Sequence, residues 1–276
     1  MDQNLLAVAG GKKPADLVVK NGKVVNVFSG EIYDGGVAVA GDKIAAVGDV
    51  DYTIGEHTKI LDAQGRYLTP GFIDGHIHPE SSNLAIRPFA EAVLRHGTTV
   101  IMTDLHEIGV VGGLPAIEAV LKEAEATDLK LYFVVPSHVP FSPNLETSGG
   151  RFDTEIIKRA LERPDAVGLS ECVGMYLAAG FPELLASCDA ALAKGMSLQG
   201  HLPDADAATL NTCVAAGVST DHESLSGKDV VDRLRAGCSV MLREGSSARS
   251  LTQLLEPVLA GRLDTSNLSI VTDDLH

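Results

Sequence analysis

Tryptophan is absent from the 276 residues, and aromatic residues make up only 4% of them. A surface that stacks nucleic-acid bases needs aromatic side chains, and a phosphate-binding surface needs a stripe of Lys and Arg; the sequence shows neither. The formal net charge is -15, from 37 acidic and 22 basic residues. We therefore expect no nucleic-acid partner, and the acidity suits a globular enzyme with a small-molecule substrate.

Cysteine is scarce, and no two cysteines form a Cys-x-x-Cys pair, which excludes the usual zinc-ribbon and thioredoxin-like signatures. We expect all four to be reduced, buried thiols, as in a cytoplasmic protein. No stretch approaches the roughly 18 apolar residues that a membrane-spanning helix needs, and the N-terminal segment has no signal-peptide pattern. The sequence thus predicts no membrane partner. The cysteines are Cys172, Cys188, Cys213 and Cys238.

Short strands separated by turns fill residues 16–62. Apolar and polar residues alternate around Asn21-Gly22 and around Gly41-Asp42, and each dipeptide is typical of a two-residue hairpin turn. Five short strands of this kind predict a small β-sandwich or part of one. We assign residues 1–69 to this small β-domain.

From residue 70 onward, apolar strand-like runs alternate with helical stretches. This alternation predicts parallel βα units, and eight runs predict a closed (β/α)8 barrel of the α/β class over residues 70–276. No GxGxxG motif follows the first run, which argues against a dinucleotide-binding sheet. The runs are PGFIDGHIH, TTVIMTDLH, LKLYFVVPSH, AVGLSE, MSLQGH, VSTDHE, CSVMLRE and LSIVTDD.

Histidines gather at the C-terminal ends of these runs, which form the active-site face of such a barrel. Seven of the nine histidines lie there, and only His57 and His96 lie elsewhere. A random scatter would not favour one end of the strands, so the pattern predicts a histidine-rich site. The seven are His76, His78, His106, His138, His201, His222 and His276.

Four of these histidines are candidate metal ligands. His76 and His78 are two residues apart on a strand, so their side chains point to the same side and can hold one metal ion. His201 and His222 end the fifth and sixth runs. The alternatives are solvated loop histidines for the first pair and buried core histidines for the other two. Neutral imidazole suits zinc, iron or manganese, so the ligand type leaves the metal open.

Two carboxylates are candidate ligands and catalytic groups. Asp273 ends the last run, where it can contact a metal ion, accept a proton from a bound water and return it to a leaving amine. We favour it over its neighbour Asp274. Glu171 ends the fourth run and could bridge two metal ions; the alternative is a salt bridge at the mouth of the barrel.

Substrate contact is predicted for four more polar residues at this end of the barrel. For His106 and Glu107 after the second run, for Glu223 after the sixth and for His138, two other roles remain open: hydrogen bonding that supports a metal ligand, or a plain surface role. After the seventh run, in Arg243-Glu244-Gly245-Ser246, the residues could position substrate, or Ser246 or Ser247 could cap the next helix. The four candidates are His106, Glu107, Glu223 and Ser246.

Around the strand ends the chain carries seven motifs. They are GFIDGHIHPESS, TDLHEIG, GLSECVGM, QGHLP, STDHES, MLREGSSAR and VTDD. In this combination they resemble the adenine deaminase family of the amidohydrolase superfamily, over about residues 16–276. The first motif alone indicates only the superfamily. Many superfamily members bridge their metals with a carboxylated lysine on the fourth strand, and the glutamate found here instead fits the adenine deaminase pattern.

This resemblance implies hydrolytic deamination of adenine to hypoxanthine and ammonia. It implies a binuclear divalent metal centre, of manganese or iron and less typically zinc, and a hydroxide that attacks C6 of adenine while Asp273 moves the proton. The sequence departs from the family at Leu105, where proline is usual, and at His138. The ligands that the resemblance implies are His76, His78, Glu171, His201, His222 and Asp273.

Family members continue beyond the eighth strand, so we expect a chain that ends at His276 to be C-terminally truncated and its barrel to be incomplete, lacking the last helix. Unpaired strand edges would then favour self-association into a homo-oligomer. Two other functions stay open. One is another amidohydrolase, acting on a cyclic amide, an N-acyl group or a different amino-purine. The other is a non-catalytic homologue or inactive fragment.

Overall fold

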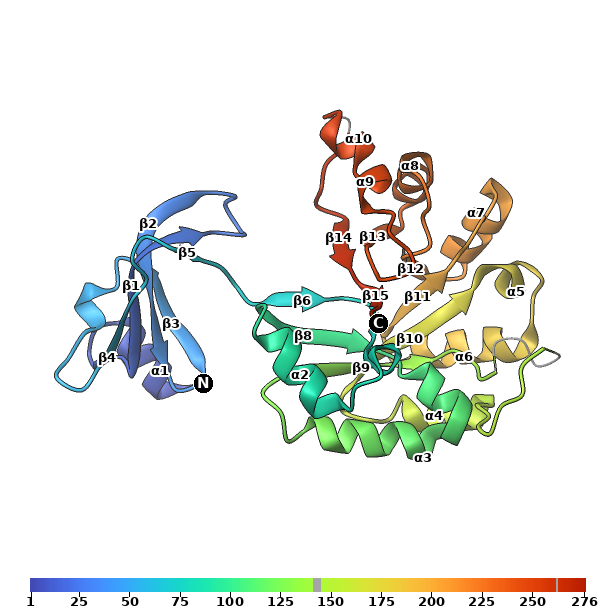
Figure 1. The fold of residues 1–276 in the computed structure, drawn as a ribbon, viewed down its shortest axis with the longest axis horizontal. Coiled ribbons are helices and arrows are strands. Elements are labelled where there is room, and N and C mark those ends of the chain that lie inside the picture. The colour runs from blue at the N-terminus through green and yellow to red at the C-terminus, as the bar shows by residue number, and fades with distance from the viewer. Residues whose placement is uncertain (141–144, 262) are drawn as a thin grey trace. The chain divides into compact units, whose positions relative to one another are not determined.

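A computed structural model describes residues 1–140, 145–261 and 263–276 of the chain. The described residues divide into two compact units, Met1–Gly71 and Phe72–His276. Figure 1 shows the first unit in blue and the second in cyan to red. Each unit has its own apolar core, so each is described by itself.

The N-terminal unit is a single mixed sheet of five strands with a short helix, α1 (Gln3–Ala9). The strand order is β3-β2-β1-β4, and β5 also pairs with β1. Its core is small and contains Val8 of α1 packed with Val18 and Ala38 of the sheet. The strands are β1 (Leu17–Val25), β2 (Ile32–Ala40), β3 (Lys43–Gly48), β4 (Lys59–Asp62) and β5 (Tyr67–Leu68).

One of the two predicted hairpin turns is confirmed and the other is wrong. Gly41-Asp42 joins β2 to β3, and Ala40 pairs with Lys43 across it. Asn21-Gly22 instead lies inside β1, where the register against β2 shifts between Val19 and Gly22. Asn21 has a φ of 57° there. A bulge and a hairpin turn both use a left-handed residue, so the dipeptide signals the conformation without saying which of the two forms.

The C-terminal unit is a (β/α)8 barrel, which confirms the predicted fold class. Eight strands are parallel and follow the order β14-β13-β12-β11-β10-β9-β8-β6. The first and last barrel strands each have two parts, and the pairing of β15 with β7 closes the barrel. The strands are β6 (Phe72–Asp74), β7 (Ile77–His78), β8 (Thr98–Thr103), β9 (Lys130–Pro136), β10 (Ala166–Val173), β11 (Ser197–His201), β12 (Val218–Asp221), β13 (Ser239–Arg243), β14 (Leu268–Val271) and β15 (Asp273–Asp274).

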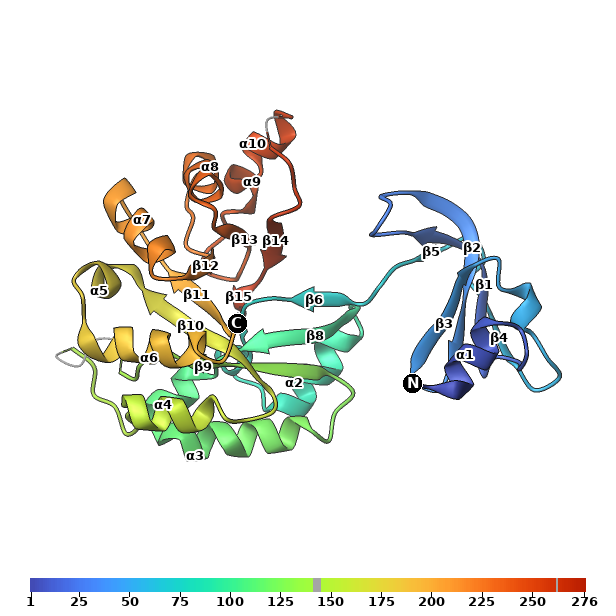
Figure 2. The same ribbon diagram turned by 180° about the vertical axis from the view of Figure 1, so that it is seen from behind.

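Helices lie on the outer side of these strands, as the two views in Figures 1 and 2 show. Several begin where a side chain caps the free N–H groups of the first turn: Asp153 caps α4, Asp206 caps α7, and Ser226 forms a capping box with Asp229 at α8. The helices are α2 (Ile86–Leu94), α3 (His106–Ala124), α4 (Thr154–Ala160), α5 (Gly174–Ala178), α6 (Pro182–Leu192), α7 (Ala207–Ala215), α8 (Gly227–Ala236), α9 (Leu251–Leu254) and α10 (Glu256–Leu259).

The main apolar core of the barrel lies between its central strands and the helices outside them. Phe133, Leu169 and Leu198, from β9, β10 and β11, are fully buried in it. A second cluster joins Ile77 and Ile101 near the closure of the barrel. These contacts fix the strands and therefore the polar residues at their ends. Within the described part of the chain, no helix is both long enough and apolar enough to cross a membrane.

Candidate metal centre

Six predicted ligands meet at the C-terminal ends of the barrel strands. Five of them are buried, and His201 is partly exposed. They come from five different strands or strand ends, so the barrel and not the local sequence brings them together. The six are His76, His78, Glu171, His201, His222 and Asp273.

Ligand atoms of these residues approach one another in two groups that share one histidine. The first group is His76, His78 and Asp273, and the second is His76, Glu171 and His222; within each, one ligand atom per residue lies within 4.8 Å of the others. The rings of His76 and His222 stack with their centroids 3.8 Å apart. Two adjacent groups of this kind match what a binuclear centre requires.

The carboxylate of Glu171 lies in the middle of the histidines. Its Oε1 is 3.2 Å from His76 Nε2 and 3.4 Å from His222 Nε2. Its Oε2 faces another histidine, 2.7 Å from His201 Nδ1. Because the two oxygens face different histidines, this side chain can contact two cations at once.

An unusual backbone conformation aims this carboxylate. Glu171 has a φ of 54°, and the register between β10 and β11 shifts between Leu169 and Cys172. A left-handed residue other than glycine costs about 1–3 kcal/mol, and bulges next to active sites commonly redirect a side chain. The hydroxyl of Ser137 donates to the carbonyl oxygen of Glu171 at 2.7 Å and helps to hold this conformation. Asp273 is also left-handed, with a φ of 58°.

Charges in the cluster shift one another's proton affinity. Burial raises the pKa of Glu171, but the imidazoles of His222 and His201 outweigh it and hold that pKa well below its usual range. Burial alone would lower the pKa of His222, yet the Glu171 and Glu223 carboxylates raise it to about 9. For His76, burial and the neighbouring His222 lower the pKa. The carboxylates are therefore charged and offer strong anionic ligands.

Three imidazole nitrogens in the cluster are buried and make no hydrogen bond of normal geometry among the described residues: His76 Nε2, His78 Nδ1 and His201 Nδ1. A buried polar atom without a partner is costly. His76 Nε2 and His201 Nδ1 face Glu171, and both could instead coordinate a cation, whereas His78 Nδ1 faces Asp104. Four imidazoles and two carboxylates suit a divalent transition metal, and this donor set alone does not select among zinc, iron and manganese.

A cavity of about 390 Å³ opens onto the cluster. Three of the residues predicted to contact substrate line it: His106, Glu107 and Glu223. Ser246 is not among its lining residues; its N–H donates to the Asp274 carbonyl oxygen at 2.8 Å. The alternative that Ser246 or Ser247 caps the next helix is wrong, because the residue that precedes α9 is Ser250; substrate contact by Ser246 stays a prediction.

His106 and Glu107 do not end a strand, as the sequence predicted, but begin α3. Leu105, with a φ of 53°, turns the chain from β8 into that helix. The carboxylate of Asp104 then lies between two histidines, with Oδ1 3.2 Å from His78 Nδ1 and 3.4 Å from His106 Nδ1. The sequence placed Asp104 at the strand end without a role, and the structure shows it supporting a candidate ligand from behind.

The apolar wall of the same cavity was missed in the sequence. Val173, Met175, Tyr176 and Pro203 line it together with the charged groups. Met175 and Tyr176 belong to α5, whose five residues are too few to show helical periodicity. A planar apolar ring could lie against this wall while its polar atoms face the metal cluster.

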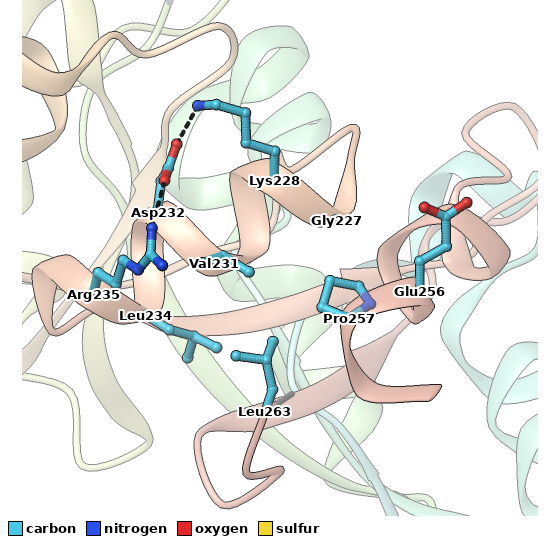
Figure 3. Close-up of a pocket in the computed structure, with 9 residues that line it drawn as sticks. All are labelled: Gly227, Lys228, Val231, Asp232, Leu234, Arg235, Glu256, Pro257 and Leu263. Carbon is cyan, nitrogen blue, oxygen red and sulfur yellow. Dashed lines mark hydrogen bonds and ion pairs between the residues drawn. The ribbon is translucent and has the colours of Figure 1, made fainter. Parts of the chain in front are cut away.

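A larger groove on the barrel, about 700 Å³, lies along α8 and α10 and includes none of the predicted site residues (Figure 3). The two cationic side chains of the groove both pair with Asp232: Lys228 Nζ lies 2.5 Å and Arg235 Nη1 3.9 Å from its carboxylate oxygens. The groove therefore presents paired surface charges and no chemistry comparable with that of the histidine cluster.

Comparison with known protein families gives a match to the family described as the amidohydrolase family, over residues 67–261. An adenine deaminase of Moorella thermoacetica is 41% identical over 99% of the chain, and adenine deaminase 3 of Rhizobium meliloti is 39% identical over 99%. The chain spans 46% of the length of each of these relatives.

Solved structures share the fold at low sequence identity. A crystal structure of an adenine deaminase has a TM-score of 0.64 at 19% identity, covering 94% of this chain and 73% of that one. A triazine hydrolase from Arthobacter aurescens has a TM-score of 0.66 at 16% identity, covering 93% of this chain and 71% of that one. Different activities are therefore found on this architecture.

Proposed function

Because the chain belongs to the amidohydrolase family, we propose that it carries the binuclear metal centre of an enzyme that deaminates adenine hydrolytically to hypoxanthine and ammonia. The observation that carries the proposal is the meeting of four histidines, Glu171 and Asp273 in two adjacent ligand groups. The similarity to adenine deaminases along 99% of the chain supports the choice of substrate.

In this proposal the histidines and carboxylates divide between two positions. His76, His78 and Asp273 hold one ion, His201 and His222 hold the other, and Glu171 contacts both. Manganese or iron is the metal we propose. When bound, divalent ions of this kind lower the pKa of a coordinated water, so that hydroxide is available near neutral pH.

The proton transfers fall to Asp273. Its Oδ1 lies 3.3 Å from His78 Nε2 and 3.8 Å from His76 Nε2, next to the proposed ion. It takes a proton from the attacking water as the oxygen bonds to C6 of adenine. It then gives the proton to the amino nitrogen on C6, which leaves as ammonia when the C–N bond breaks. One water is consumed for each ammonia released.

The purine ring would lie against Met175 and Tyr176, with its polar edge toward His106 and Glu107. We propose a cytoplasmic location for the enzyme, which the four buried free cysteines support, because free thiols persist in a reducing compartment.

The experiment that tests this function measures metal content and ammonia release from adenine after loading with Mn²⁺. We expect about two ions per chain, and Asp273→Asn should lower the rate by about 10²–10⁴-fold because a general base is lost. Asp274→Asn is the matched control and should retain most of the rate. Ammonia release from cyclic amides or N-acyl compounds, but not from adenine, would overturn the proposed substrate.

A further inference from the structure

Arg243 ends β13, the barrel strand between β12 and β14. The two neighbouring strands lead to different parts of the proposed centre: β12 leads to His222 and Glu223, and β14 leads to Asp273. We propose that Arg243 is a positioning residue: it joins the carboxylates of Glu223 and Asp273 and so fixes the two halves of the metal centre relative to each other. This inference rests on the ligand set of the proposed function.

One nitrogen of the guanidinium makes both contacts. Arg243 Nη1 is 2.5 Å from Glu223 Oε1 and 2.6 Å from Asp273 Oδ2. The three side chains are mostly buried, with 13%, 9% and 7% of their surfaces exposed. Solvent screens such pairs weakly, so the contacts restrain both carboxylates.

On the Asp273 side, the contact decides which oxygen faces the histidines. Oδ2 accepts from the guanidinium, which leaves Oδ1 directed at His78 Nε2, 3.3 Å away. Rotation of the carboxylate would exchange the two oxygens and break the bond to Arg243. The arginine therefore holds ready the oxygen that would contact an ion.

On the Glu223 side, the same cation reaches the other half of the centre. Glu223 Oε1 is 3.3 Å from His222 Nε2 and 3.7 Å from His201 Nδ1. The same oxygen accepts from Arg243 Nη1, so the guanidinium restrains a carboxylate that already contacts His222 and His201. Arg243 therefore sets where Glu223 lies relative to this half of the centre.

The backbone after Arg243 is fixed against the strand that carries Asp273. Glu244 N–H donates to the Val271 carbonyl oxygen at 3.0 Å. A Cβ on Gly245 would lie 2.5 Å from the Thr272 carbonyl oxygen, so a larger residue would push the two segments apart. The base of the arginine side chain thus has a defined position relative to Asp273.

Arginine suits this place better than lysine. A guanidinium nitrogen carries two hydrogens in a planar fork and can serve two carboxylates in fixed directions, whereas an ammonium is a point charge on a flexible chain. Groups that orient metal ligands in this way commonly change metal affinity by 10–100-fold when they are removed.

The test compares Arg243→Ala, Arg243→Lys and the surface control Arg235→Ala, with Mn²⁺ as the probe. Titration of metal-free protein gives the number of ions bound and their dissociation constants. We expect Arg243→Ala to weaken binding by about 10–100-fold, Arg243→Lys to recover part of the loss, and added guanidinium to restore binding to Arg243→Ala. Arg235→Ala should bind Mn²⁺ as the wild type does.

Wild-type affinity in a folded Arg243→Ala protein, checked by circular dichroism, would overturn the inference. Weakened binding that guanidinium does not restore would also overturn it, since a general loss of packing would explain that result. If Arg243→Ala does not fold, Arg243→Gln and Arg243→Lys replace it in the test. Equal Mn²⁺ affinity in these two variants and in the wild type would contradict a role for the guanidinium. Mn²⁺ binding does not depend on adenine turnover: two bound ions without ammonia release would refute only the proposed substrate.

Discussion

Two arginines lie beside the histidine cluster, Arg233 fully buried and Arg243 mostly buried, and they make different contacts. Arg233 pairs with Asp221, the residue before His222, and Arg243 pairs with Glu223 and Asp273. Both link a cation to carboxylates near the proposed ligands. They differ in how completely their hydrogen-bonding capacity is used.

The network around Arg233 is closed. Each of its three nitrogens has an acceptor: Nε donates to the Asp221 carboxylate, Nη1 to the Asp229 carbonyl oxygen and Nη2 to the Leu202 carbonyl oxygen. Asp221 in turn accepts from the N–H groups of Leu202 and Glu223. The pair therefore ties together the chain next to His201, the last residue of β11, and the chain next to His222, which directly follows β12.

The network around Arg243 is open. Nη1 serves two carboxylates, while Nε is buried and has no hydrogen-bond partner among the described residues. Arg243 also lines the cavity over the metal cluster. The comparison teaches that a fully satisfied buried pair supports the fold, whereas an incompletely satisfied one beside a cavity indicates a group that serves the site.

Breaking the closed network should have the largest effect on stability. Arg233→Ala leaves the fully buried carboxylate of Asp221 without its cation, which typically costs about 3–5 kcal/mol. Urea unfolding measures the loss, with Arg235→Ala as the exposed control, whose effect should stay within about 0.5 kcal/mol. A loss below about 1 kcal/mol for Arg233→Ala would show that this pair does not support the fold.

Metal binding at the centre beside Arg243 should stabilise the fold. At a free Mn²⁺ concentration 100 times its dissociation constant, the free energy of unfolding should rise by about 2.7 kcal/mol, and a chelator should reverse the change. Thermal unfolding with and without Mn²⁺ measures it. His222→Ala removes a proposed ligand and should lose most of this gain; equal stabilisation of both proteins would place the ion elsewhere.

Another buried carboxylate, that of Asp74, sharpens the comparison because its hydrogen bonds among the described residues come from a hydroxyl and from backbone N–H groups rather than from an arginine. Asp74 accepts from the Thr272 hydroxyl at 2.5 Å and from the N–H groups of Thr272 and His76 at 3.3 Å each. Thr272→Val removes the hydroxyl and should lower the free energy of unfolding by about 1–3 kcal/mol.

Thr99→Val is the matched control in urea unfolding, since its hydroxyl makes a 3.5 Å contact in an exposed place. Equal effects of the two variants would mean that the link between the first and last barrel strands adds no stability. The effect of Thr272→Val should also be smaller than that of Arg233→Ala, because no charge is left without its partner cation.

The barrel could be predicted from the sequence because each strand is an apolar run that ends in polar residues. That pattern repeats eight times, so an error in one run would not change the result. The meeting of His76 with His222 could be predicted for the same reason, since strand ends converge at one face of a barrel whatever their separation in sequence.

Details that depend on one residue's partners could not be predicted. Asn21-Gly22 forms a bulge and not a turn because β1 continues through it and pairs with β2, β4 and β5. The dipeptide alone does not predict such pairing with strands distant in the sequence. The start of α3 at His106 depends on the left-handed Leu105, a residue that rarely takes this conformation. The wall formed by Met175 and Tyr176 belongs to a helix too short to be recognised.

Leu105, Glu171 and Asp273 share the left-handed backbone, each next to or within the metal site. Glycine would relieve this strain at all three positions, but at Leu105 it would also remove a fully buried side chain of the main apolar core, at a cost of about 2–5 kcal/mol. It would also remove two of the proposed ligands. Directed evolution of this barrel toward higher thermal stability should therefore retain Leu105, while Glu171 and Asp273 would change only under conditions where activity is no longer selected.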